Sequence, residues 1–254
     1  MNSILDVIAT FSENKTSVIS ALRCTGFMSA KLTSDGLCLG SSAAHYLGED
    51  ALLASIRVDD GASLCVTSPG ITYLRQTESQ TTQKTDLDTG RFSSLAYVPR
   101  PILLQADCNH REEIILNHTH ESKILLSSIY ILGRHNEAPG YCTTLSCIKQ
   151  NGEVKIRQER VFSKEAYPPF RSKKLRVFAS IFIYDLTLKP ILTKAKAVSD
   201  GALCSVLNPY ENAFEFVAAG QDMIAIREVL FKALEQNINA EDMHQIRQKL
   251  KFSF

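Results

Sequence analysis

The sequence contains no tryptophan, and neither sign of charge dominates it. Its 254 residues include 28 Lys and Arg against 27 Asp and Glu, so the formal net charge is +1. A charge this small argues against nucleic acids and anionic membrane surfaces as partners. The absence of tryptophan removes the largest aromatic platform that a sugar-binding site could use. Composition therefore disfavours nucleic-acid, membrane-surface and carbohydrate partners.

Long apolar runs are also absent. No stretch of about 18 apolar residues occurs, so we expect no transmembrane helix. The N-terminus has no basic region followed by an apolar stretch, because residues 12–15 (SENK) interrupt it early. The seven cysteines are odd in number and show no C-x-x-C spacing, which is typical of a reducing compartment. We expect a cytoplasmic protein whose cysteines are mostly small core residues.

Local signatures of catalysis are missing. The sequence has neither a G-x-x-x-x-G-K-[ST] loop nor a G-x-G-x-x-G turn after a strand. It also lacks the G-x-S-x-G and H-E-x-x-H motifs of hydrolases and metallopeptidases. We therefore expect that the protein is not an enzyme.

Alternation of apolar and polar residues dominates from about residue 15 to about residue 205. In Ala51–Val58, every second residue is apolar and faces one side, as in a half-buried strand. In Leu175–Tyr184, both alternating sets are apolar, which predicts a strand covered on both sides. Asn151-Gly152 lies between two further strand-like segments and predicts a hairpin turn.

Three turn-then-strand segments recur about every 30 residues. They are 60–64 (DGASL), 89–95 (TGRFSSL) and 120–124 (HESKI). This spacing is that of stacked β-coils, in which each coil buries its apolar face on the next. The pattern predicts a mainly β protein with a β-helix-like, or solenoid-like, stack of strands.

Only the C-terminal part, about 220–252, shows helical periodicity. Apolar residues at positions 226, 229, 230, 233 and 234 predict one buried helix stripe. A second helix is expected from Asn239, with Met243, Ile246 and Leu250 on its apolar face. We expect a short helical pair appended to one β domain within 1–254, either capping an open edge of the β body or docking to a partner.

Histidines form the nearest approach to a metal site. His118 and His120 are two residues apart, so on a strand they would share a face, and Cys108 and His110 lie upstream. Imidazole nitrogen suits nickel, zinc and copper. The alternative is that residues 117–121 (NHTHE) form a polar turn between two apolar runs. The sequence leaves both interpretations open.

Paired acids and one basic stretch complete the candidates. Glu112-Glu113 and Asp59-Asp60 are neighbours, and neighbours in a strand face opposite sides, so they do not by themselves form an acid/base pair. Eight Lys and Arg residues lie between Lys155 and Arg176. They fit a solvated face or a dock for an acidic protein partner better than nucleic-acid binding.

The middle of the chain, about 48–160, resembles the UreD/UreH family of urease accessory proteins. Three segments carry the resemblance: 51–68 (ALLASIRVDDGASLCVTS), 95–101 (LAYVPRP) and 125–134 (LLSSIYILGR). They follow the family's order of a strand, a Gly-Ala turn, a strand ending in Thr-Ser, a leucine-and-proline segment and a strand closing in Gly-Arg. The chain departs from the family at Ser128, where an acidic residue is usual, and at Leu104-Gln105, where Pro-Phe is expected.

The resemblance implies a scaffold without catalytic residues. Such proteins bind urease apoprotein together with a helical accessory protein and a GTPase, and help to deliver nickel to the active site. It implies no tightly bound cofactor, only transient nickel, for which His118 and His120 are the first candidates. Ser128 puts an acid-lined metal route in doubt at that position. The alternatives are a β-solenoid enzyme acting on polysaccharide and a non-catalytic β-binding module.

Overall fold

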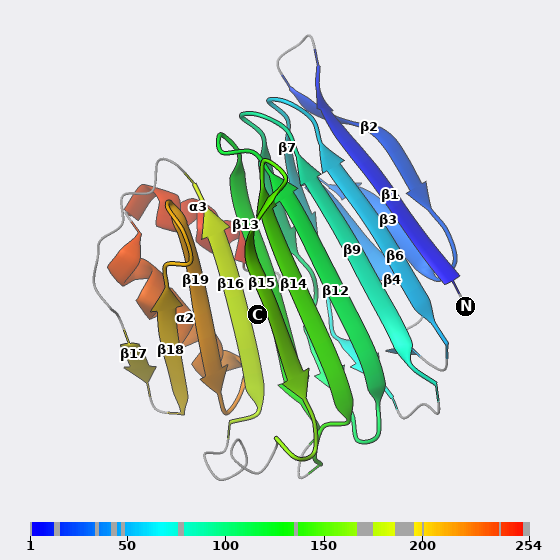
Figure 1. Cartoon of the computed structure of the whole chain (residues 1–254), viewed down its shortest axis with the longest axis vertical. Helices are drawn as coiled ribbons and strands as arrows, with labels where there is room; N and C mark the ends of the chain where they lie inside the picture. The colour runs from blue at the N-terminus through cyan, green and yellow to red at the C-terminus, as the bar shows by residue number, and fades with distance from the viewer. Residues whose placement is uncertain are drawn as a thin grey trace.

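Two large β-sheets lie face to face in the computed structural model, with helices behind one of them (Figure 1). The structure describes residues 2–12, 16–33, 36–41, 45–46, 49–75, 79–134, 137–166, 175–185, 196–199, 201–238 and 240–250. Within these ranges one sheet, called sheet A, has seven strands, and the other, sheet B, has twelve.

Sheet A contains the N-terminal strands and ends at a hairpin, and sheet B continues farther in that direction (Figure 1). Its strand order is β15 (Glu153–Phe162), β14 (Tyr141–Gln150), β12 (Asn109–His118), β9 (Thr81–Thr89), β6 (Ala51–Val58), β1 (Asn2–Phe11) and β2 (Ser17–Cys24). The five inner strands are parallel, and the hairpin partners β15 and β2 run antiparallel at the two ends.

Sheet B lies behind it. Its main path is β17 (Lys196–Ser199), β18 (Ala202–Leu207), β19 (Ala213–Gly220), β16 (Val177–Tyr184), β13 (Lys123–Leu132), β10 (Ser94–Val98), β7 (Ser63–Thr67), β4 (Gly36–Ser41) and β3 (Met28–Thr33). Three short strands pair beside this path: β5 (His45–Tyr46), β8 (Thr72–Leu74) and β11 (Ile102–Leu104).

The strand register confirms the predicted repeat and the solenoid-like stack. Ala51, Thr82, Arg111 and Thr143 are Cα partners on successive parallel strands of sheet A, each about 30 residues after the last. Sheet B has the same step in β7, β10 and β13. Each coil therefore contributes one strand to each sheet, and its apolar face is buried on the next coil.

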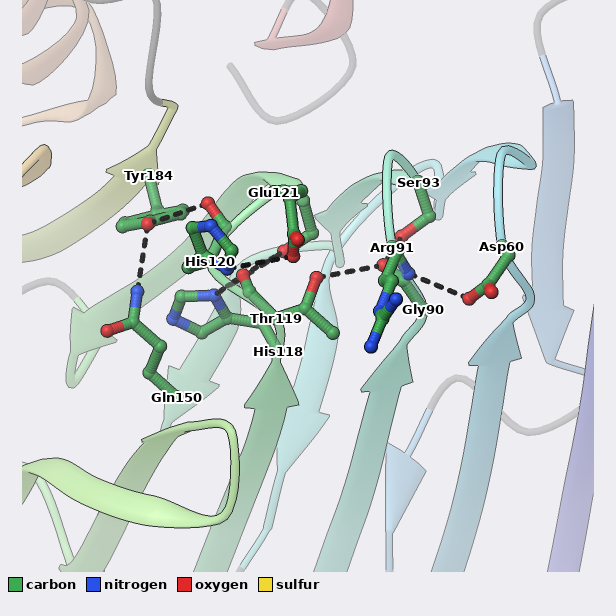
Figure 2. Close-up of polar contacts among 11 residues, drawn as sticks. Asp60, Gly90, Arg91, Ser93, His118, Thr119, His120, Glu121, Gln150 and Tyr184 are labelled. Carbon is green, nitrogen blue, oxygen red and sulfur yellow. Dashed lines mark hydrogen bonds and ion pairs between the residues drawn. The ribbon is translucent and has the colours of Figure 1, made fainter.

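The three predicted turn segments lie on top of one another where sheet A passes into sheet B. The Gly61 N–H donates to the Arg91 carbonyl over 2.8 Å, and the Lys123 N–H donates to the Ser93 carbonyl over 2.8 Å. Figure 2 shows this stack, in which the Asp60 carboxylate also accepts from the Arg91 N–H. Backbone N–H and C=O groups that would bind water in an isolated turn thus form hydrogen bonds between neighbouring coils.

Burial follows the predicted alternation. In β6, residues 52, 54, 56 and 58 are buried and the residues between them are exposed or half-buried. β16 is covered on both sides, as its sequence predicted: Ile181 and Ile183 pack toward the helices, and Phe182 and Tyr184 pack toward sheet A. The hairpin at Asn151-Gly152 is confirmed too, because both residues have positive φ and join β14 to β15.

The predicted helical pair is α2 (Met223–Asn237) and α3 (Ala240–Leu250). Asp222 caps α2, its carboxylate accepting from the Ala225 N–H over 2.8 Å. The predicted stripe is buried, as are Met243, Ile246 and Leu250 of α3; Asn239 lies outside the described residues. The pair packs on the outer face of sheet B rather than on an open edge.

Strands extend beyond the expected range of 15–205, beginning at Asn2 and ending at Gly220. The outward residues of β1 include Ile4 and Ile8, so its inward set of Leu5, Val7 and Ala9 is less conspicuous than that of β6. β19 alternates less clearly because the helices cover its other face. None of the helices in the described ranges is long and apolar enough to cross a membrane.

Candidate functional site

A row of buried polar side chains lies between the two sheets. Gln83, Glu112, Thr144 and Arg160 are Cα partners on the neighbouring strands β9, β12, β14 and β15, and all face sheet B. Sheet B faces them with Tyr130, Ser180 and Glu215. We call these seven residues the polar seam. Most of the surrounding core is apolar, so such a row requires a specific network of partners.

Glu112 is the carboxylate at the centre of the seam. It is 3% exposed, accepts a hydrogen bond from the Tyr130 hydroxyl and a second from Gln83 Nε2 at 3.3 Å. Burial raises the pKa of Glu112 to about 6, and the Tyr130 hydrogen bond offsets part of that rise. Both hydrogen-bond partners of the carboxylate are neutral, so no neighbouring positive charge lowers its pKa and the effect of burial is the larger one.

Replacing Glu112 by glutamine should therefore stabilise the protein above pH 6. The pKa of Glu112 is higher in the folded chain than the usual 4.5, so its contribution to stability is present below pH 4.5 and lost as pH rises through 6. That loss is about 2 kcal/mol at about 1.4 kcal/mol per pKa unit. Urea unfolding at pH 8 and pH 4.5 should show a gain for Glu112→Gln only at pH 8. Equal effects at both values would contradict this account.

Arg160 and Glu215 join the two sheets. Arg160 Nη2 lies 2.5 Å from Glu215 Oε1, and both side chains are largely buried. Ser180 donates to the same carboxylate oxygen over 2.7 Å, while the guanidinium lies 5.3 Å from the centre of the Phe178 ring. The Glu215 charge is thus matched by one cation and one hydroxyl, which is what a buried carboxylate requires.

Ser128 lies in the same part of the seam. A cavity of about 20 Å³ is lined by Ser128 together with Ser146, Gln158, Arg160, Ser180 and Glu215. Ser128 is the Cα partner of Ser180, whose hydroxyl holds Glu215. A carboxylate is therefore present beside position 128, but β19 provides it and Arg160 neutralises it.

His110, Cys108 and Cys142 lie beside the middle of the seam, because His110 and its Cα partner Cys142 come two residues before Glu112 and Thr144 on the same strands. His110 is buried; its Nδ1 lies 2.8 Å from Thr81 Oγ1, and its Nε2 has no hydrogen-bond partner within the described part of the chain. Burial lowers the pKa of His110 to about 4 and raises the pKa of Cys108 to about 11. Cys142, the Cα partner of His110, also has a raised pKa because it is buried. These are neutral groups near pH 7.

His118 and His120 do not share a face. His118 ends β12 and is buried, whereas His120 lies in the following turn with more than half of its side chain exposed. His118 Nδ1 lies 2.8 Å from the Thr119 carbonyl oxygen, which can only accept, so Nδ1 is the protonated nitrogen and donates to it. His118 Nε2 then accepts a hydrogen bond from the Tyr210 hydroxyl over 2.8 Å. The polar turn of 117–121 is present, and nickel binding by the two histidines stays a prediction.

Alanine at each histidine should separate structure from metal binding. His118→Ala removes a buried ring and leaves the Tyr210 hydroxyl without its acceptor, so we expect the free energy of unfolding to fall by about 2 kcal/mol. His120→Ala should leave stability within about 0.5 kcal/mol. Denaturant titration checks the stabilities, and calorimetric nickel titration of His120→Ala checks the metal prediction. Equal stability losses would contradict the burial difference.

Metal donors elsewhere are dispersed. Across the ranges that the structure describes, no three His, Cys, Asp or Glu side chains lie close enough to hold a metal ion together. All seven cysteines are free thiols; Cys108, Cys142 and Cys204 are buried as predicted for core residues, and the other four are half-buried.

The carboxylates considered for polysaccharide hydrolysis do not converge. Glu112 points into the core, and Glu113 points to the outer face of the same strand. Asp59 lies at the coil turn, where it pairs with Arg57 over 2.8 Å. No pair of these three flanks a common groove, so they offer no acid and base for glycoside cleavage.

The basic residues between Lys155 and Arg176 are also dispersed. Arg160 is part of the seam, Lys155 pairs with Glu153, and Lys164 pairs with Asp107. Arg171, Lys173 and Lys174 lie outside the described residues, as does most of the double-proline segment. The described members therefore do not form one continuous basic surface.

Several seam residues escaped the sequence analysis. Glu215 lies inside an apolar run, Phe214-Glu215-Phe216, and a lone acid in such a run is the one pattern that could have marked it. No sequence pattern distinguishes Tyr130 and Gln83, because both occupy ordinary strand positions.

Comparison with known proteins agrees with this architecture. The family model described as UreD urease accessory protein matches residues 30–247. Urease accessory protein UreD 2 of Saccharopolyspora erythraea is 25% identical over 166 residues. That alignment covers 63% of this chain and 59% of the relative, so the chain spans less than two thirds of the relative's length. Because the family match covers most of the sequence, the chain belongs to the UreD family of urease accessory proteins.

Proposed function

We propose that this protein is a scaffold in urease maturation, which binds urease apoprotein with a helical accessory protein and a GTPase. The family match over residues 30–247 carries the proposal. The dispersed carboxylates and the missing nucleotide-binding motifs agree with a non-catalytic role in the cytoplasm, where the GTPase would hydrolyse the nucleotide.

The polar seam is the candidate path for nickel as cargo. Hard and borderline divalent cations take carboxylate oxygens as ligands, and Glu112 and Glu215 bring two carboxylates into the core. Glu112 is held by neutral donors, so an arriving cation would replace the Tyr130 hydrogen bond without displacing another positive charge. A single carboxylate holds a cation weakly, which suits a protein that must release its cargo.

Glu215 differs from Glu112 in this respect. Arg160 already neutralises it, so a cation could use this carboxylate only after the ion pair opens. The seam thus offers the Glu112 carboxylate, which has no cationic partner in the contacts described above, and the Glu215 carboxylate, which is paired with Arg160. Exposed His120 remains the proposed first contact for nickel at the surface.

Urease activation in cells tests the proposal. Cells that express urease, the other accessory proteins and no copy of this chain should produce urease with little nickel and little activity, and the wild-type chain should restore both. Glu112→Ala should restore less than wild type. Glu113→Ala, the same substitution at an outward-facing position of the same strand, is the matched control and should restore fully. Full urease activation without the chain would overturn the proposal.

A further inference from the structure

Both sheets end on an unpaired strand at the same end of the molecule. Among the described residues, β2 pairs only with β1 in sheet A, and β3 pairs only with β4 in sheet B. β1 and β4 in turn adjoin β6 and β7, the strands of the first full coil. Each sheet therefore continues two strands past that coil, and residues 25–27 join the two edge strands directly.

These edge strands lack the usual protection against pairing. β2 (SVISALRC) and β3 (MSAKLT) contain Arg23 and Lys31 as their only charged residues and have no proline. The edge strand at the far end of sheet A, β15 (EVKIRQERVF), has five charged residues in ten. Charges and prolines on edge strands prevent association with other chains. One end of sheet A is thus protected and the other is not.

Apolar side chains are exposed along the unprotected edges. Leu32 is 59% exposed, Val18 is 43% exposed and Leu22 is 41% exposed. A cleft of about 600 Å³ is lined in part by Val18, Ile19 and Leu32, and it extends from these edges to Ser63, Ser94 and Lys249. The terminal coil of a solenoid needs a cap over its apolar end, and within the described ranges no strand pairs with the outer edge of β2 or of β3.

We propose that this end binds a second copy of the chain. A two-fold axis perpendicular to the sheets would pair β2 with the β2 of the other copy and β3 with its β3. Identical strands related by such an axis are antiparallel, so both pairs would form regular ladders. Since β2 and β3 are consecutive strands of one terminal coil, the proposed axis serves both sheets.

The end face comes close to the size that such an interface needs. Its length is about 27 Å, from eight residues at about 3.4 Å each, and two sheets about 10 Å apart with their side chains give a width of about 20 Å. The flat area of about 500 Å² underestimates the accessible area. The face therefore approaches the roughly 600 Å² per partner at which stable interfaces begin. Joining the two ends would also cover Leu22 and Leu32 on both copies, because both lie on the inward faces of their strands.

Sedimentation velocity of the purified full chain over a wide dilution series tests the proposal. The wild type should form dimers at high concentration. The double variant Leu22→Glu/Leu32→Glu should raise the dissociation constant at least about tenfold, because like charges meet across the axis. Leu203→Glu, a substitution of an equally exposed leucine on β18, should leave the dissociation constant unchanged.

A charge-swap experiment identifies the occupant. Leu22→Lys/Leu32→Lys should form mixed dimers with the double glutamate variant, and circular dichroism should show that both are folded. A wild type that stays monomeric at every concentration would overturn the proposal, as would a double glutamate variant that dimerises like wild type. No urease protein is present, so the result does not depend on the proposed function.

Discussion

Replacing Arg160 by methionine is expected to lower the free energy of unfolding by about 3–5 kcal/mol, the cost of leaving a buried charge without its partner. Glu215 would keep only the Ser180 hydrogen bond in an otherwise closed part of the core. Methionine preserves most of the side-chain volume, so the loss would come from the charge rather than from a cavity. Urea unfolding at pH 7 measures it.

The double variant Arg160→Met/Glu215→Met is the decisive control. A buried ion pair replaced as a whole by apolar residues of similar size costs little and can add stability. We therefore expect the double variant to recover most of the stability that the single variant loses. Additive losses would mean that Arg160 and Glu215 contribute through separate contacts, and that the two sheets are not joined by this pair.

Replacing Gly90 by valine is expected to destabilise the protein by about 3 kcal/mol, at the upper end of overpacking effects. Gly90 lies in the second of the stacked turns (Figure 2). A Cβ placed there would approach Asp60 Oδ1 to 2.2 Å and the Asp60 backbone nitrogen to 2.7 Å. The side chain can rotate away, but the backbone nitrogen cannot move without separating the first two coils. Thermal and urea unfolding both measure the loss.

Gly70→Ala separates this crowding from backbone strain. Gly70 has a φ of +83°, but a Cβ added there would meet no atom within 4 Å. The expected cost is about 1 kcal/mol, from the left-handed backbone conformation alone. If Gly90→Val cost no more than Gly70→Ala, the turns would not be packed on one another as described.

Local patterns were sufficient to predict the coil stack. Residues 60–64, 89–95 and 120–124 carry the same turn-then-strand order because each performs the same task one coil apart. The stripe of α2 and the hairpin at Asn151-Gly152 are local in the same sense. The resemblance seen over 48–160 is likewise part of a longer family match over residues 30–247.

The polar seam could not be predicted in this way. Arg160 and Glu215 are 55 residues apart and belong to different sheets, so their meeting depends on which strands face each other. The prediction that the two histidines share a face was wrong for a related reason. His118 and His120 have strand spacing, but β12 ends at His118, and the partner of its Nε2, Tyr210, comes from 92 residues further along the chain.

Affinity purification with urease tests the central claim most directly. The full-length chain, tagged and expressed with urease subunits and the other accessory proteins, should retain nickel-free urease apoprotein at low salt. Arg160→Met/Glu215→Met, which should keep the fold, should retain it equally if binding uses the outer surfaces. Failure of the wild-type chain to retain any urease subunit under these gentle conditions would contradict its assignment as a urease-maturation scaffold.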